Sequence, residues 1–130
     1  MKTLAQIRAQ NALKCSEQKL EGENEGDIVN KIPSLIQNNG LMAALAFCYN
    51  KSKKDKEKGK DKGEGKDKGA GYRILLNFIV DHLSHPEINI TKSKNIDDFM
   101  NELSNGDAYL LRRATHETLA FLNYVKRFAK

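Results

Sequence analysis

The chain has 130 residues, of which 39% are hydrophobic, which is enough apolar material for one compact domain and hardly for two. It carries 22 Lys and Arg against 17 Asp and Glu, a formal net charge of +5. No apolar run approaches the roughly 18 residues of a membrane-spanning helix, and the polar N-terminus has no signal-peptide core. We therefore expect a single cytoplasmic domain over residues 1–130 without a membrane partner.

The helical period dominates the first third of the chain. Thr3 can cap a first helix, in which apolar side chains recur at three- and four-residue spacing as far as Leu20. The stretch 21–26 is acidic, contains glycine and predicts a break.

A second helix is predicted over residues 27–38, which carry apolar side chains on one face. Pro33 lies inside this stretch, so either the helix bends there or its first turn begins near Asn30. Gly40 predicts the end of the helix, because glycine readily takes the left-handed conformation found at helix C-termini. Residues 41–49 are apolar nearly all round, which is typical of a buried helix.

Most of the excess charge lies in residues 51–71. This segment holds nine Lys, three Asp, two Glu and five of the nine glycines, a net charge of +4. It has no large apolar side chain, so it cannot bury enough surface to offset its ordering entropy. We predict a flexible loop between two helices. As a function for it we favour a solubilising linker over an RNA-contacting arm, because the interspersed acids weaken its field.

Three further helices are predicted after the charged segment. Residues 72–83 have helical apolar spacing and are followed by a His-Pro pair that ends the helix. Asn95 can cap a short helix over 96–103, and Asp107 can cap the longest one, over 108–129. The sequence as a whole predicts an all-α, single-domain bundle of five or six helices.

Motifs for catalysis or cofactor binding are absent from the sequence. Cys15 and Cys48 are too few for a disulfide framework and are expected to be buried free thiols. His82 and His85 could share a helix face, but no third ligand is spaced to complete a metal site. The His-Glu pair of the last helix lacks the second histidine of a zinc protease helix. We expect no metal, no cofactor and no enzymatic activity.

The last predicted helix has two different faces. At about 100° per residue, the apolar face consists of Leu110, Leu111, Ala114, Thr118, Phe121, Leu122, Val125 and Phe128. The opposite stripe is mostly basic and consists of Arg112, His116, Asn123, Arg127 and Lys130. Such a stripe can follow a phosphate backbone without reading bases, and a solvated polar face is the alternative. Leu119 and Tyr124 flank the stripe, and their exposure would favour a partner-binding surface.

Two blocks of the sequence together resemble a known family. The first runs from Ile32 to Phe47 and contains IPSLI and NGL; the second combines Tyr109 with RATHETLAFLNYVKRFA at residues 113–129. They resemble the signature blocks of the small helical subunit of type III-B CRISPR effector complexes, the Cmr complexes. The resemblance covers nearly the whole chain except the charged segment, to which no family role transfers. Tyr124 stands where many relatives have tryptophan.

The resemblance implies a non-catalytic subunit. In such complexes a backbone filament holds the guide RNA, and copies of the small subunit form a shorter filament whose basic surfaces line the channel for the target RNA. The implied partners are the backbone and other Cmr subunits, further copies of this chain, and guide and target RNA. The implied candidates for RNA contact are Arg112 or Arg113, Lys126 and Arg127, to which the basic stripe adds Lys130.

A hypothesis from another class remains open beside this one. A helical adaptor or assembly scaffold would use the same bundle without touching RNA, and an enzyme is a distant third. Co-purification of RNA with a large multi-subunit complex would separate the first two hypotheses.

Overall fold

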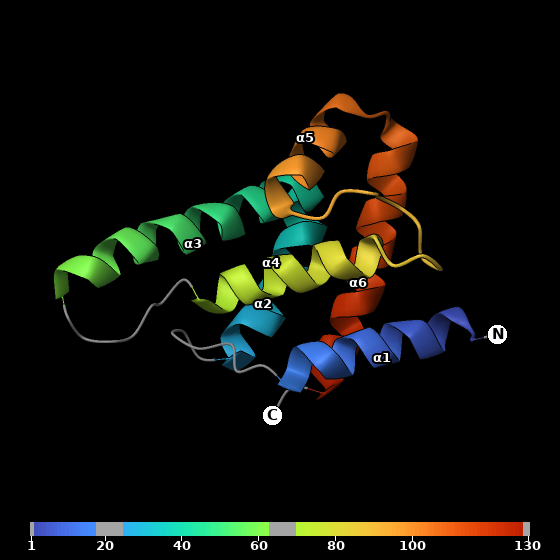
Figure 1. The fold of residues 1–130 in the computed structure, drawn as a ribbon, viewed down its shortest axis with the longest axis horizontal. Helices are drawn as coiled ribbons and strands as arrows, with labels where there is room; N and C mark the ends of the chain where they lie inside the picture. The colour runs from blue at the N-terminus through green and yellow to red at the C-terminus, as the bar shows by residue number, and fades with distance from the viewer. Residues whose placement is uncertain (1, 18–24, 63–69, 129–130) are drawn as a thin grey trace.

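A computed structural model describes residues 2–17, 25–62 and 70–128 of the chain, which form six helices and, within these ranges, no strand. The all-α prediction is confirmed. Figure 1 shows α1 and α4 crossing α6, with α5 at the end of the bundle where α6 begins. The helices are α1 (Leu4–Glu17), α2 (Glu25–Asn39), α3 (Leu41–Lys62), α4 (Ala70–Leu83), α5 (Ile96–Asn105) and α6 (Ala108–Phe128).

One continuous hydrophobic core joins all six helices. The α1 helix packs across α6, α2 packs against both α3 and α6, and α3 packs against α4. Three aromatic side chains, Tyr72, Phe99 and Phe121, are fully buried in this core. Because α6 contacts α1, α2 and α4, one side of it is enclosed while the other remains available to solvent. None of the described helices is long and apolar enough to cross a bilayer.

The predicted capping residues occupy helix N-termini. The Thr3 hydroxyl accepts a hydrogen bond from the Gln6 amide at 3.2 Å, and the Gln6 side chain accepts one from the Thr3 amide at 2.8 Å. Asn95 accepts from the Asp98 amide at 2.8 Å. Asp107 does the same for the first turn of α6, at 2.9 Å. Each contact satisfies an N–H group that has no partner inside its own helix, and the capping predictions are confirmed.

The α2 helix passes through Pro33 without interruption. It begins at Glu25, so the alternative in which the helix starts near Asn30 is wrong. Proline lacks an N–H, and the Val29 carbonyl therefore receives no helical hydrogen bond from position 33. The helix ends as predicted at Gly40, which has a φ of +92° and donates its N–H to the Ile36 carbonyl at 2.8 Å.

The α3 helix ends later than the sequence predicts. It continues beyond Tyr49 to Lys62, and α4 already begins at Ala70. Residues 51–62 contain no large apolar side chain, but lysine and glutamate are good helix formers and can extend an existing helix. Residues 63–69 between the two helices, like Leu20, lie outside the described residues, and a loop between α3 and α4 is consistent with these helix bounds. Its flexibility stays a prediction.

Candidate nucleic-acid interface

The apolar face predicted for the last helix is the buried face of α6. Ala114, Thr118, Phe121, Leu122 and Val125 are all buried. Leu110, Leu111 and Phe128 are half-buried and pack against the core from the ends of the helix. The prediction of this face is confirmed, and it fixes the orientation of every other side chain on α6.

The opposite face of α6 carries exposed basic side chains. Arg112, Arg113, Lys126 and Arg127 are exposed, as is His116 between them. We call the stripe of Arg112, His116, Asn123 and Arg127, with Arg113 and Lys126 beside it, the basic face of α6. Arg112 and Arg127 are separated by about 22 Å along the axis at 1.5 Å per residue. Lys130 lies outside the described residues.

The single acidic residue within α6 does not reach this surface. Glu117 is buried and accepts two hydrogen bonds from the guanidinium of Arg8, both at 2.7 Å. The α1 helix therefore neutralises the only carboxylate of α6 on the inner side. As a result, every charged side chain that α6 exposes is basic, although the net charge of the chain outside 51–71 is nearly zero.

Glu117 also belongs to a network that joins α1, α4 and α6. His82 Nε2 lies 2.9 Å from its carboxylate, and His82 Nδ1 lies 2.8 Å from the side-chain nitrogen of Asn11. The Asn11 amide nitrogen can only donate, so Nδ1 accepts and Nε2 carries the proton toward Glu117. The imidazole is stacked on Phe121, with ring centroids 4.4 Å apart. His82 is thus a structural histidine.

The network determines the charge state of Glu117. Burial raises the pKa of its carboxyl, but hydrogen bonds from Arg8 and His82 outweigh this and lower the pKa from 4.5 to about 2. The hydrogen bond with Glu117 in turn raises the pKa of Arg8, against the opposing effect of burial. Both groups are charged at neutral pH, so Arg8 and Glu117 form an ion pair. Sequence analysis missed it because Arg8 and Glu117 are far apart in the chain.

Tyr109 is an exposed aromatic residue that sequence analysis did not assign to the basic face. It is 63% exposed, and the Arg113 guanidinium carbon lies 5.7 Å from the centroid of its ring. The spacing of Tyr109, Arg112 and His116 places them on one side of the helix, and this signal was present in the sequence. An exposed tyrosine among arginines offers a ring on which a base can stack.

The two residues predicted as a partner interface are less exposed than the basic residues around them. Leu119 and Tyr124 are half-buried and pack against the core. The Tyr124 ring lies 6.4 Å from that of Phe128. Their role as interface residues stays a prediction.

The cysteines and histidines form no metal-binding cluster within the described ranges. Cys15 and Cys48 are buried and not joined in a disulfide, as predicted. Burial raises the pKa of the Cys48 thiol to about 12, despite the opposing charge of Lys31, so the thiol is protonated at neutral pH. His85 lies beyond the end of α4, with its Nδ1 accepting a bond from the Glu87 amide.

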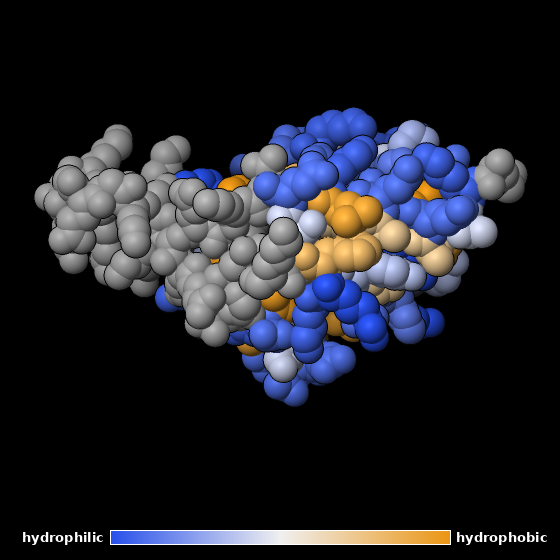
Figure 2. Space-filling model, turned by 90° about the horizontal axis from the view of Figure 1, so that it is seen from below, coloured by the Kyte–Doolittle hydropathy of each residue, from blue (hydrophilic) through white to orange (hydrophobic). Residues whose placement is uncertain are grey.

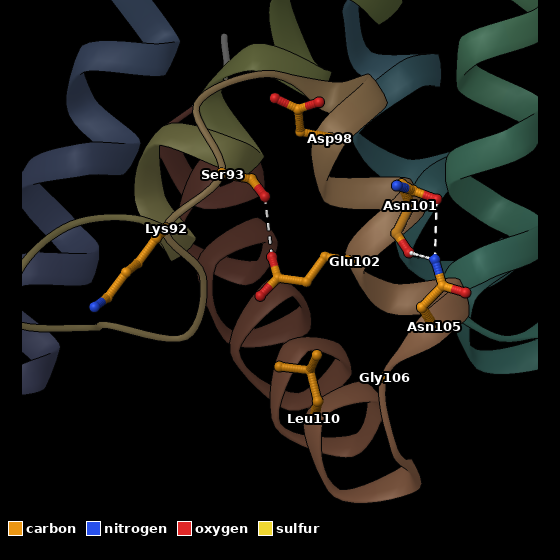
Figure 3. A pocket seen from close by; sticks show the side chains of 8 residues that line it. All are labelled: Lys92, Ser93, Asp98, Asn101, Glu102, Asn105, Gly106 and Leu110. Atoms are coloured by element: carbon orange, nitrogen blue, oxygen red, sulfur yellow. Dashed lines mark hydrogen bonds between the residues drawn. The ribbon is translucent and has the colours of Figure 1, made fainter.

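A shallow polar pocket of about 630 Å³ lies between α5, the start of α6 and the preceding loop. Figure 3 shows Ser93 and Glu102 pointing toward each other across it, joined by a 3.0 Å hydrogen bond. Thr91 donates a second hydrogen bond to Glu102. The side-chain amide of Asn105 donates hydrogen bonds to the side-chain oxygen and the backbone carbonyl of Asn101. Most polar groups of the pocket form hydrogen bonds with one another. These contacts attach the loop to α5.

Figure 2 shows one face, on which the described residues are mostly hydrophilic around a central apolar patch. Three large apolar side chains are exposed among the described residues: Leu4, Leu13 and Tyr109.

Comparison with known proteins identifies the family. A family model described as CRISPR-associated protein (Cas_Cmr5) matches residues 4–130. The chain belongs to the Cmr5 family. This confirms the resemblance to the small subunit of type III-B Cmr complexes that the two sequence blocks indicate. The match also includes the charged segment, which the sequence blocks do not cover.

A solved structure supports the same fold. The crystal structure of a CRISPR-associated Cmr5 family protein from Thermus thermophilus matches with a TM-score of 0.66 and 23% sequence identity. The match covers 98% of this chain and 95% of that one. At this identity the likeness establishes the fold. A search of curated proteins finds no significant match.

Proposed function

We propose that this Cmr5 family member is a non-catalytic subunit of an RNA-targeting type III-B complex, and that the basic face of α6 contacts the backbone of guide or target RNA. The observation that carries the proposal is the uniform sign of the charges that α6 exposes. Its one carboxylate, Glu117, is held inside by Arg8, so no acid on α6 opposes an approaching phosphate.

The chemistry of the basic face fits contacts that do not depend on base sequence. Arginine and lysine side chains on a helix bind phosphate oxygens and so position a strand without identifying its bases. In the proposed complex, guide–target pairing supplies sequence recognition. This chain would add phosphate contacts and pack along the backbone filament beside further copies of itself.

The proposal is tested by reversing the charge of two arginines that no described side chain uses in an ion pair, Arg112 and Arg127. We expect the Arg112→Glu/Arg127→Glu variant to bind unstructured RNA at least about fivefold more weakly in roughly 50 mM salt. The slope of log affinity against log salt concentration should decrease by about 1.4, because each lost single-strand phosphate contact contributes about 0.7. Fluorescence anisotropy with labelled RNA measures both quantities.

Lys92→Glu/Lys94→Glu is the matched control, because it changes the net charge equally at two exposed lysines outside α6. It should retain affinity within about twofold. Equal affinity of both variants would contradict RNA contact through α6 and favour the scaffold hypothesis. Binding that is independent of salt, or that strongly prefers one base sequence, would also contradict the proposal. Circular dichroism verifies that the helical content is unchanged.

A further inference from the structure

A groove lies between the start of α1, the loop that follows α4, and the flank of α6 that faces α1. Two hollows form it, one of about 290 Å³ beside α6 and one of about 460 Å³ beside the start of α1. Leu4 and Glu87 line both hollows, so the two hollows adjoin at these residues. Figure 1 shows the start of α1 and the loop after α4 on the same side of α6. We call the two hollows together the α1–α6 groove.

The floor of the groove is apolar. Ile88 and Ile90 line the hollow beside α6, and Ile7 lines the other one. Ile7 and Ile88 are buried, whereas Leu4 is 44% exposed where the hollows meet. An apolar side chain of a partner that packed against Leu4 and this floor would be removed from water, which favours binding.

Basic side chains lie toward both ends of the groove. Arg113 and His116 line only the hollow beside α6, and Lys2 lines only the other one. All three are exposed. The Lys2 ammonium group donates to the uncharged side chain of Gln10 at 2.9 Å, and the Arg113 guanidinium lies over the Tyr109 ring. Within the described ranges neither cation has an acidic partner, so both charges are available to carboxylates from outside.

Two carboxylates line the groove, and they differ in what they can do. Glu117 is bound to Arg8 and His82 and is therefore already paired. Glu87 is exposed, and no ion pair joins it to a basic group in the part of the chain that the structure describes. Its carboxylate can accept a backbone N–H of a peptide but repels a phosphate. The groove therefore favours a peptide over a nucleic acid.

The loop wall of the groove is held in place by its own backbone. The Ile88 and Asn89 amides donate to the His85 carbonyl at 2.9 Å and 2.8 Å. The Ile90 amide donates to the Leu83 carbonyl at 3.0 Å. Asn89 has a φ of +51°, a left-handed conformation in which asparagine is common among non-glycine residues. A wall held in this way loses little conformational freedom when a partner binds.

We propose that the α1–α6 groove binds a segment of a partner protein in which an apolar side chain is flanked by acidic residues. The apolar side chain packs against Leu4 and the isoleucines of the floor. The acidic side chains reach Arg113 at one end and Lys2 at the other, and Glu87 accepts a backbone N–H between them. This interaction goes beyond the proposed function, because it needs neither RNA nor the outer side of α6.

The experiment measures binding of the full chain to a fluorescent peptide of about seven residues, roughly 23 Å long when extended. The peptide has leucine at its centre, glutamates on both sides and blocked ends. We expect Lys2→Gln/Arg113→Gln to bind it at least about fivefold more weakly, because a charge-assisted hydrogen bond is lost at each end. Fluorescence anisotropy in roughly 50 mM salt measures the affinity.

The matched control is Lys14→Gln/Arg112→Gln. It removes the same two charges from the same two helices, at exposed residues that do not line the groove. It should bind the peptide within about twofold of the parent, because charges outside the contact are screened by salt. Circular dichroism verifies that both variants keep their helical content.

A second pair of variants tests the apolar contact without changing the charge. Leu4→Ala should weaken peptide binding about threefold, because part of the apolar contact is lost. Leu13→Ala is its control, since Leu13 is on the same helix, is 46% exposed against 44% for Leu4, and does not line the groove. It should leave the affinity unchanged. A peptide with serine in place of the central leucine should bind the parent about as weakly as the original peptide binds Leu4→Ala.

Four results would overturn the proposal. They are an affinity of the parent for the acidic peptide weaker than about 1 mM, equal weakening by a variant and its control, equal binding of a peptide with lysines in place of the glutamates, and a loss in Leu4→Ala of polyuridine binding but not of peptide binding. The last result would assign the groove to RNA. The proposed function fails separately, because its own test is the RNA affinity of Arg112→Glu/Arg127→Glu.

Discussion

Two groups of charged side chains in this protein have opposite arrangements. At the junction of α1, α4 and α6, Arg8 and Glu117 are paired at 2.7 Å, and His82 completes the network. On the outer side of the same α6 helix, Arg112 and Arg127 are exposed and have no acidic partner among the described residues. The first group uses its charges to join helices, and the second presents them to solvent.

The difference shows how one helix can hold its only acid inside the bundle and expose charges of a single sign. Burying Glu117 requires that Arg8 stay bound to its carboxylate. The exposed face of α6 is then left with charges of one sign. Substitutions on the inner side should therefore change the free energy of unfolding. Substitutions on the outer side should change RNA affinity and leave that free energy within about 0.5 kcal/mol of the parent.

The largest expected effect on stability comes from removing the shared carboxylate. Glu117→Ala leaves the Arg8 guanidinium and the buried His82 N–H without their acceptor, and we expect a loss of about 3 kcal/mol in the free energy of unfolding. Urea denaturation followed by circular dichroism measures it. Asp81→Ala removes an exposed carboxylate from α4 and serves as the control. Equal losses in the two variants would mean that the network does not stabilise the bundle.

A smaller effect should appear in the pH dependence of stability. The folded-state pKa of Glu117 is lowered to about 2 from 4.5, so its contribution is complete above about pH 4.5 and is lost as the pH falls through about 2. The difference in unfolding free energy between the parent and Glu117→Gln should therefore shrink between about pH 5 and about pH 2. A difference that stays constant over this range would show that the carboxylate is not held as an anion by Arg8 and His82.

The smallest effect concerns the residue next to Glu117. The Thr118 hydroxyl is buried and has no hydrogen-bond partner among the described residues, so Thr118→Val should stabilise the protein by about 1 kcal/mol. Thr115→Val is the matched control, because the Thr115 hydroxyl donates to the Leu111 carbonyl at 2.7 Å, and its loss should bring no gain. Thermal unfolding compares the two. A destabilised Thr118→Val would indicate that the hydroxyl is satisfied in solution.

The parts of the fold that the sequence predicted depend on local signals. Thr3, Asn95 and Asp107 cap helices because their side chains reach amides three residues away, and Gly40 ends α2 through its own backbone conformation. The α3 helix continues to Lys62, beyond its last apolar residue, so the absence of apolar residues does not mark its end. That absence indicates only where packing stops, which need not be where hydrogen bonding stops.

In the candidate site, too, the features that depend on local signals could be predicted and those that depend on distant contacts could not. The basic face of α6 was predictable, because the helical period of about 3.6 residues assigns each side chain to a face. The network could not be predicted, because the Arg8–Glu117 contact joins residues 109 positions apart and depends on how α1 lies on α6. Tyr109 follows the same helical period as Arg112, so its place on this face could also be predicted from the sequence.

The two buried cysteines have a practical consequence. Cys15 belongs to α1 and Cys48 to α3, and both side chains are almost completely shielded from solvent. A thiol reagent can therefore modify each one only when its own helix separates from the bundle. Pulse labelling followed by mass spectrometry would use the native cysteines as two internal reporters. It would show whether α1, which carries Arg8, opens before α3 or together with it.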